Sequence, residues 1–115
     1  MQSNPVLNEA ILNLRHAYKK SRAPIWLKLQ EILERPGSNV EVNLNKLSKY
    51  TDDGDVVIVP GKVLGTGTME HKITLCVYSL SESAAKKVTA AGCKIINIKE
   101  FVEKFPQGSK VKIIV

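Results

Sequence analysis

The stretch that decides the fold is Val56-Val57-Ile58-Val59-Pro60-Gly61-Lys62-Val63-Leu64-Gly65-Thr66-Gly67. Its first four residues are all branched and apolar, which predicts a strand buried on both faces. Pro60-Gly61 predicts the end of that strand, because proline cannot donate a ladder hydrogen bond and glycine tolerates a sharp reversal. The residues after the reversal are one lysine, Lys62, and two glycines where a backbone can come close to another molecule.

The segment from Pro60 to Gly67 is expected to meet an anion, because no acidic residue occurs between Asp55 and Glu70. A P-loop does not fit, since it needs serine or threonine after Gly-Lys and this chain has Val63 there. A dinucleotide fingerprint does not fit either, because Glu70 occupies the position of its third glycine. An RNA phosphate and a phosphorylated metabolite remain as candidate ligands, and a glycine turn without any ligand remains as the plain alternative.

The composition indicates one folded domain with a basic surface. The 115 residues are 43% hydrophobic, which is enough for a proper core. Lysine and arginine total 17 against 11 acidic residues, a formal net charge of +6 that permits nucleic acid, an anionic membrane surface or solubility alone. No apolar run approaches the ~18 residues of a membrane span and no signal-peptide pattern is visible, so we expect a soluble cytoplasmic protein.

Catalysis and metal binding have little support in the sequence. Cys76 sits in a strand-like run as a small hydrophobic residue, and no further ligands are spaced to join it and Cys93 in a metal site. Asp52, Asp53 and Asp55 lack the spacing of an EF-hand and indicate a solvated acidic turn. No Ser-His-Asp arrangement is visible. We therefore expect no enzyme activity, no catalytic residue, no metal ion and no cofactor.

Two helices are predicted at the start of the chain. Residues 4–20 have helical apolar spacing, with Asn4 as the cap and Pro5 at the first helical position. A second helix is predicted from Ala23-Pro24 to Arg35, ended by Pro36-Gly37. Its helical neighbours place Trp26 in a core, in preference to a base-stacking platform.

The strongest local charge feature covers the end of the first helix and the start of the second. No acidic residue lies between Glu9 and Glu31. The same window holds the cations Arg15, Lys19, Lys20, Arg22 and Lys28. Such a run suits a polyanion, because lysine and arginine gain affinity there by releasing condensed counterions.

From residue 40 onward short strands and short helices alternate. The predicted strands are 40–44, 56–59, 73–78, 94–96 and 111–115, and the predicted helices are 45–50, a segment capped by Ser81 or Ser83 that ends at Ala91, and 97–105. This alternation predicts an α/β fold. We expect a single domain over residues 1–115, made of a helical arm at 1–36 and an α/β core at 37–115.

The segment Val59 to Gly67 resembles the signature loop of the archaeal and eukaryotic large-subunit ribosomal protein eighteen, the L-eighteen-e family, which shares a superfamily with bacterial ribosomal protein fifteen. The similarity covers nearly the whole chain, through these landmarks in order: Asn4-Pro5, Trp26, Val42-Asn43-Leu44 with Lys46 and Tyr50, and Pro106-x-Gly108-Ser109. Family members often carry arginine or lysine in the linker where this chain has Gly37-Ser38-Asn39, and Arg35 is expected to compensate in part.

The resemblance implies irregular strand-strand-helix superhelical turns preceded by an N-terminal helical segment. It also implies a structural role in the large ribosomal subunit. The implied partners are large-subunit ribosomal RNA and neighbouring ribosomal proteins, with no membrane.

The residues themselves indicate where RNA is expected to bind. A lysine flanked by glycines can reach a phosphate while backbone amides supply further donors. The expected contacts are Gly61, Lys62, Gly65 and Gly67 in one region, Arg15, Lys19, Lys20 and Arg22 in a second, Asn43 and Lys46 in a third, and Arg35 beside the linker. Two rival hypotheses stay open: a small α/β domain that binds a phosphorylated metabolite at Pro60–Gly67, and an interaction module whose Trp26 helix docks on a protein.

Overall fold

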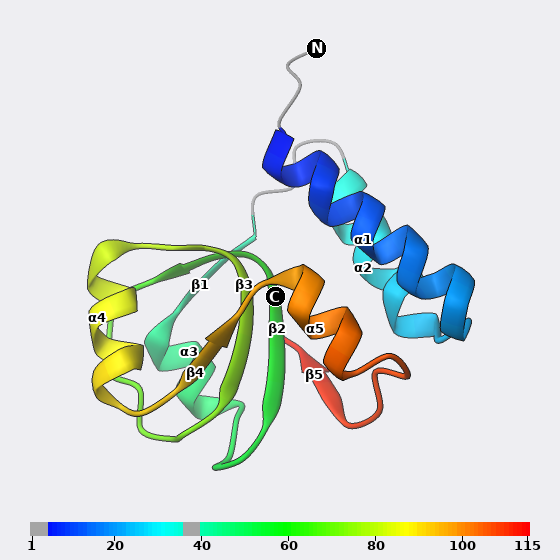
Figure 1. Cartoon of the computed structure of the whole chain (residues 1–115). Coiled ribbons are helices and arrows are strands. Elements are labelled where there is room, and N and C mark those ends of the chain that lie inside the picture. The colour runs from blue at the N-terminus through cyan, green and yellow to red at the C-terminus, as the bar shows by residue number, and fades with distance from the viewer. Residues whose placement is uncertain (1–4, 36–39) are drawn as a thin grey trace. The chain divides into compact units, whose positions relative to one another are not determined.

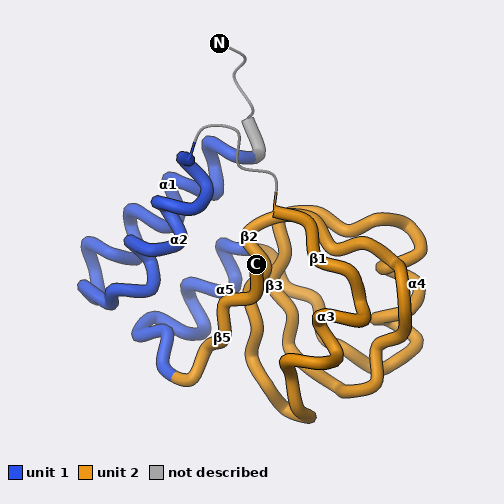
Figure 2. Tube along the Cα trace, turned by 180° about the vertical axis from the view of Figure 1, so that it is seen from behind, with its two compact units in different colours: residues 1–38, 98–109 blue, residues 39–97, 110–115 orange. Residues whose placement is uncertain are grey.

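The structure is a computed structural model, and it describes residues 5–35 and 40–115 (Figure 1). The chain divides into two compact units, shown in different colours in Figure 2. The helical unit comprises residues 1–38 and 98–109, and the sheet unit comprises residues 39–97 and 110–115. Each unit has its own sequence logic and is described by itself.

The helical unit contains α1 (Pro5–Ser21), α2 (Pro24–Glu34) and α5 (Ile98–Lys104). All three helices were predicted from apolar spacing, and their ends agree with the predictions to within about a residue. The predicted cap Asn4 and the predicted stop at Pro36-Gly37 lie outside the described residues. Proline at the first position of α2 follows an extended Ala23, as expected for a residue with a preset φ and no amide hydrogen.

Trp26 is the centre of the helical unit. Its side chain is 0% exposed, and its ring meets the Phe101 ring edge-on with the centroids 5.7 Å apart. Its indole Nε1 donates hydrogen bonds to the carbonyl oxygen of Pro106 at 2.8 Å and to Ser21 Oγ at 3.1 Å. The core role predicted for Trp26 is confirmed. An RNA-stacking platform or a protein-docking surface at this tryptophan is excluded by its burial.

Helix α5 packs along α1, so it belongs with the two N-terminal helices although residues 39–97 of the sheet unit separate it from them in sequence. Phe101 and Phe105 of this segment lie with their ring centroids 5.3 Å apart. The sequence-based division into an arm at 1–36 and a core at 37–115 stays a prediction. Within the helical unit, α5 supplies the apolar surface that covers Trp26.

The sheet unit is built on strands that all pair in parallel. Its strands are β1 (Glu41–Asn43), β2 (Val56–Leu64), β3 (Thr74–Leu80), β4 (Lys94–Ile96) and β5 (Val111–Ile113). The order is β1-β2-β3-β4, and β5 also pairs with β2. Strand β3 takes one edge of β2, while β5 and β1 share the other edge, beside residues 56–58 and 62–64 respectively. The predicted α/β fold behind a helical segment is confirmed.

Two short helices of the sheet unit start directly after strands. In α3 (Leu44–Lys49) the cap is Asn43, whose Oδ1 accepts a hydrogen bond from the Lys46 amide at 2.9 Å. In α4 (Glu82–Ala90) the cap is Ser81, whose Oγ accepts from the Ala84 amide at 3.2 Å. Of the two serines proposed as caps, Ser81 is therefore the one that serves.

The predicted burial of β2 on both faces is confirmed. On one face Val57 and Val59 join a core cluster with Leu75 of β3, and α3 and α4 contribute Leu47 and Val88 to the same cluster. On the other face the strand register aligns a second apolar row, formed by Ile113, Ile58, Cys76 and Ile96. Burial raises the pKa of the Cys76 thiol to about 12, so it behaves as the small hydrophobic residue that the sequence predicted.

The predicted end of the strand at Pro60-Gly61 is wrong. Strand β2 continues to Leu64, and its register with β3 shifts between Val59 and Lys62. This bulge accommodates Pro60, because the residue at the irregularity does not need to donate a ladder hydrogen bond. Gly61 is buried, and a Cβ there would overlap the carbonyl oxygen of Val40. Glycine is therefore required for close strand approach, not for a sharp turn.

Candidate nucleic-acid interface

The four cations predicted on the first helix are all exposed. Arg15 Nη2 lies 3.8 Å from Glu34 Oε1 in a solvent-exposed pair. Arg22 follows the last turn of α1 with a φ of 59°, and its guanidinium lies 5.4 Å from the centroid of the Tyr18 ring. Lys19 and Lys20 extend from the last turn of α1. The structure brings these four cations together on the C-terminal half of α1 and the residue that follows it.

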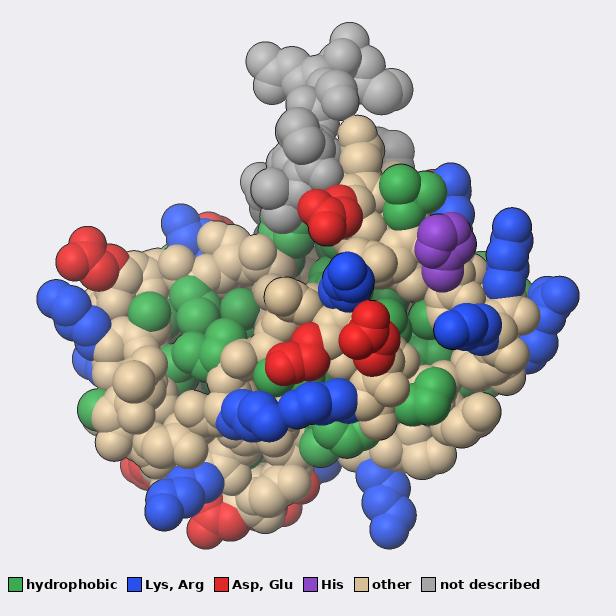
Figure 3. Space-filling view, viewed as in Figure 1, with side chains coloured by type: hydrophobic (Ala, Val, Ile, Leu, Met, Phe, Trp, Pro, Cys, Tyr) green, Lys and Arg blue, Asp and Glu red, His purple; other side chains and the backbone are tan. Residues whose placement is uncertain are grey.

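A groove of about 720 Å³ lies between α1 and α5, within the helical unit. Lysines and a histidine line it, with Glu103 as the acidic residue among the lining side chains. The lining residues are Asn13, His16, Ala17, Lys19, Lys20, Lys99, Val102, Glu103 and Pro106. Figure 3 shows blue lysine and arginine side chains gathered with a purple histidine over α1. Lys99 was missed by sequence reasoning, because nothing local to it announces that α5 packs along α1.

Lys62 is exposed, and its ammonium has no hydrogen-bond or ion-pair partner among residues 5–35 and 40–115. Its surroundings are less positive than the sequence suggested. Strand β1 pairs with this part of β2 in a register that makes Glu41 the partner of Lys62. No acidic residue lies near Lys62 in the sequence, but strand pairing brings the exposed Glu41 beside it.

Gly65 and Gly67 come close to the protein's own side chains. A Cβ on Gly65 would overlap Ser83 Oγ, and a Cβ on Gly67 would overlap Asn45 Oδ1. Lys87 Nζ donates to the carbonyl oxygen of Gly65 at 2.7 Å and to that of Gly67 at 2.8 Å. The loop that follows β2 is thus held by its own chain. Lys87 was missed by the sequence analysis because its partners lie on a different element.

The remaining predicted residues also have defined places. Asn43 caps α3, as described above. The Lys46 ammonium donates a hydrogen bond to the main-chain oxygen of Val115. Arg35 is exposed at the end of α2. Within the sheet unit the register sets Asn43 beside Leu64, so the regions of Asn43 and Lys62 lie on adjacent strands.

The acidic turn before β2 is an ion-paired structural element. Asp55 Oδ2 lies 2.8 Å from Lys112 Nζ and also accepts a hydrogen bond from the Asp52 amide at 2.8 Å. The Lys112 ammonium holds the pKa of Asp55 below its ordinary value of 3.8, and the carboxylate in turn raises the pKa of Lys112. Across the described part of the chain, no three histidine, cysteine or carboxylate side chains are grouped so as to hold a metal ion.

Comparison with known proteins agrees with the sequence landmarks. The family model described as "Ribosomal proteins 50S-L15, 50S-L18e, 60S-L27A" matches residues 27–96, which is more than half of the chain. The chain belongs to this ribosomal protein family. Within it, similar relatives are those named large ribosomal subunit protein eL18, so the predicted membership of the L18e branch is confirmed.

Three archaeal eL18 proteins illustrate the relation. The protein of Methanococcus maripaludis is 40% identical over 115 residues, which cover 99% of this chain and 96% of the relative. That of Methanoregula boonei is 36% identical, covering 98% and 94%, and that of Pyrobaculum aerophilum is 41% identical, covering 89% and 84%. The eL18 similarity therefore includes α1 and α5, both of which lie outside residues 27–96 matched by the family model.

The structure bears on both rival hypotheses without deciding them. Pro60 and Gly61 are buried in β2, and Lys87 donates hydrogen bonds to the carbonyl oxygens of Gly65 and Gly67, so much of the segment Pro60–Gly67 packs on its own chain. The Trp26 side chain itself is buried, and both metabolite binding at this segment and docking of the Trp26 helix on a protein stay hypotheses. In the parts of the chain that the structure describes, none of the helices has the length and apolar character needed to span a membrane.

Proposed function

We propose that this protein is a structural constituent of the large ribosomal subunit that binds and stabilises large-subunit ribosomal RNA. The observation that carries the proposal is the relation to eL18 proteins over nearly the full length of the chain. The proposal includes a place beside other proteins of the subunit, a cytoplasmic location and no catalytic role. A buried hydrophobic core and a formal net charge of +6 both suit a scaffold protein that binds RNA.

The cations of α1 support the RNA-binding part of the proposal. Arg15, Lys19 and Lys20 are exposed on α1 and Arg22 is exposed directly after it, so all four can reach phosphates without any change in the fold. Arginine and lysine contacts of this kind fix the register of a protein on RNA and gain free energy from counterion release. We assign the first contact region to these four residues.

Lys62 is the second proposed contact. It is exposed beside the bulge of β2, and the residues before and after it in the strand, Gly61 and Val63, are buried. In this proposal Gly61 keeps Lys62 in register against Val40, and Gly65 and Gly67 let the following loop pack on α3 and α4. Asn43 holds the start of α3, and Lys46 and Arg35 are the remaining exposed basic groups proposed to meet phosphates.

The test is binding of the full-length protein to large-subunit ribosomal RNA over a series of salt concentrations. Replacing Arg15, Lys19, Lys20 and Arg22 by alanine is expected to flatten the log–log salt dependence by ~0.7–0.9 for each phosphate contact removed. The control of equal charge replaces four exposed lysines outside the proposed regions, namely Lys49, Lys72, Lys86 and Lys110. Equal slopes for the two quadruple variants would remove α1 from the interface.

Association with the subunit is the second test. The protein is expected to sediment with large subunits at low salt and to dissociate as salt rises, since phosphate contacts weaken with ionic strength. A protein that stays entirely in the free pool at low salt would contradict the proposed function as a whole.

A further inference from the structure

The groove between α1 and α5 gathers three lysines whose charges are not used by the protein itself. In the sheet unit, Lys87 and Lys112 are held by carbonyl and carboxylate oxygens of the protein itself. In the groove, Lys19, Lys20 and Lys99 have no hydrogen-bond or ion-pair partner within residues 5–35 and 40–115. Their charges are therefore available to a ligand.

Lys99 is the residue that helix stability does not explain. Lys19 and Lys20 lie in the last turn of α1, where the helix dipole favours a cation. Lys104 occupies the same favourable end of α5, and its ammonium lies 3.9 Å from Glu100 Oε1. Lys99 instead lies in the first turn of α5, where the dipole disfavours positive charge.

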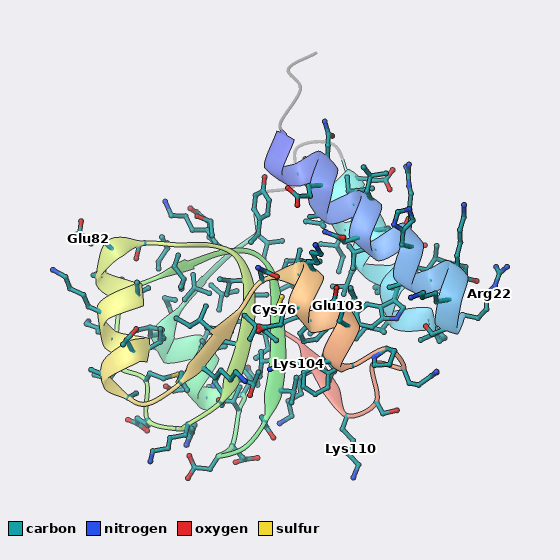
Figure 4. All side chains as sticks on the ribbon, viewed as in Figure 1. Arg22, Cys76, Glu82, Glu103, Lys104 and Lys110 are labelled. Carbon is teal, nitrogen blue, oxygen red and sulfur yellow. The ribbon has the colours of Figure 1, made fainter. Side chains whose placement is uncertain are left out.

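The shape and chemistry of the groove suit a ribose-phosphate chain. Its lining includes the apolar side chains of Ala17, Val102 and Pro106, and its lysines come from both α1 and α5. Glu103 is the acidic side chain among the lining residues, so the local charge is positive. Figure 4 labels Glu103 and Lys104 on α5 and Arg22 at the end of α1, the helices that form the two walls.

We propose that this groove binds a stretch of RNA ribose-phosphate backbone, with Lys19 and Lys20 on one wall and Lys99 on the other. The inference rests on the proposed function, because the RNA is taken to be large-subunit ribosomal RNA. The lysines of the two helices meet phosphates of one RNA strand, and the apolar lining residues lie against its ribose carbons. An acidic protein segment would meet the same three lysines, and the measurements below distinguish it from RNA.

The experiment compares Lys99→Ala with Lys86→Ala in the full-length protein. Lys86 is an exposed lysine on α4 of the sheet unit, and its ammonium lies 3.7 Å from Glu82 Oε1. Each of the two substitutions removes one positive charge. Binding to in-vitro-transcribed large-subunit ribosomal RNA is measured over a salt series. Lys99→Ala is expected to lower the log–log slope by ~0.7–0.9, and Lys86→Ala is expected to leave it unchanged.

A second measurement avoids variants altogether. The wild-type protein is treated with an acetylating reagent with and without the same RNA, and modified lysines are counted by mass spectrometry. RNA is expected to protect Lys99, Lys19 and Lys20, whereas Lys86 is modified equally in both samples. Equal modification of Lys99 with and without RNA would overturn the inference.

The two proposals fail in different ways. Wild-type binding with an unchanged slope for Lys99→Ala overturns the groove and leaves the proposed function intact. A wild-type protein that binds neither the RNA nor large subunits overturns the proposed function. A Lys99→Ala variant that binds naked RNA normally but is depleted from assembled subunits assigns the groove to a protein partner, which also overturns the inference.

Discussion

Trp26 Nε1 donates a hydrogen bond of 2.8 Å to the carbonyl oxygen of Pro106, a residue 80 positions away in the sequence. This bond ties α2 to the turn that follows α5. The indole also stands edge-on to Phe101, so one side chain joins both parts of the helical unit. Pro106 also lines the groove of this unit, so this bond helps to hold one of the groove's lining residues in place.

Trp26→Ala is expected to lower the free energy of unfolding by about 3–5 kcal/mol, because it leaves a cavity in a fully buried site. Trp26→Phe keeps most of the ring but leaves the Pro106 carbonyl without its donor, and should cost less than the alanine variant. Urea denaturation followed by circular dichroism measures both. Equal, small effects would show that Trp26 is not the centre of this core.

Three glycines separate backbone strain from crowding. Gly54 has a φ of +85° and open space where a Cβ would stand, while Gly61 has no positive φ but is crowded by Val40. Gly67 has both a φ of +94° and a clash with Asn45. Gly54→Ala is expected to cost about 1–2 kcal/mol of unfolding free energy from the left-handed backbone alone. Gly67→Ala should cost clearly more.

Gly61→Ala completes this series, since its cost comes from crowding alone, against the carbonyl group and the Cβ of Val40. The three variants are compared by urea denaturation under the same conditions. If Gly67→Ala proves no more destabilising than Gly54→Ala, the close packing of the loop on α3 is wrong.

Lys62→Ala and Lys87→Ala test which lysine serves a ligand and which serves the fold. Lys62→Ala is expected to weaken RNA binding and leave the thermal unfolding midpoint nearly unchanged, because no described residue pairs with its ammonium. Lys87→Ala is expected to lower the free energy of unfolding by about 1 kcal/mol, since it removes the donor to the Gly65 and Gly67 carbonyls. The reverse pattern of losses would exchange the two roles.

Asp55→Asn tests the ion pair with Lys112. The folded-state pKa of Asp55 is lowered, so its contribution to stability is present above the ordinary pKa of 3.8 and is lost as pH falls through the folded value. At neutral pH the variant should be less stable than the wild type, and the difference should shrink as the pH falls below 3.8. Urea midpoints at several pH values between neutral and about 3 measure this convergence.

Asp53→Asn is the matched control. Asp53 accepts a hydrogen bond from the Lys72 amide at 2.8 Å, and asparagine can keep that bond. Its stability difference from the wild type is expected to be small. A difference for Asp55→Asn that does not change with pH would contradict the role of the Lys112 ammonium.

The local elements could be predicted because their causes are local. Proline at the start of a helix, Ser81 as a cap and the branched run at the start of β2 all act within a few residues. The continuation of β2 past Pro60 could not be predicted, because it depends on the bulge opposite β3 and on the space that Gly61 leaves for Val40. Propensity indicated a turn, and tertiary pairing overrode it.

The sequence by itself determined the α/β class, the family landmarks and the run of cations on α1, because periodicity, caps and charge order are properties of neighbouring residues. Only the tertiary structure decided which charges remain available. Packing of α5 on α1 brings Lys99 to Lys19 and Lys20, and strand pairing brings Glu41 beside Lys62. The physical reason is that electrostatic interactions depend on distances in space, and folding places residues far apart in the chain within reach of one another.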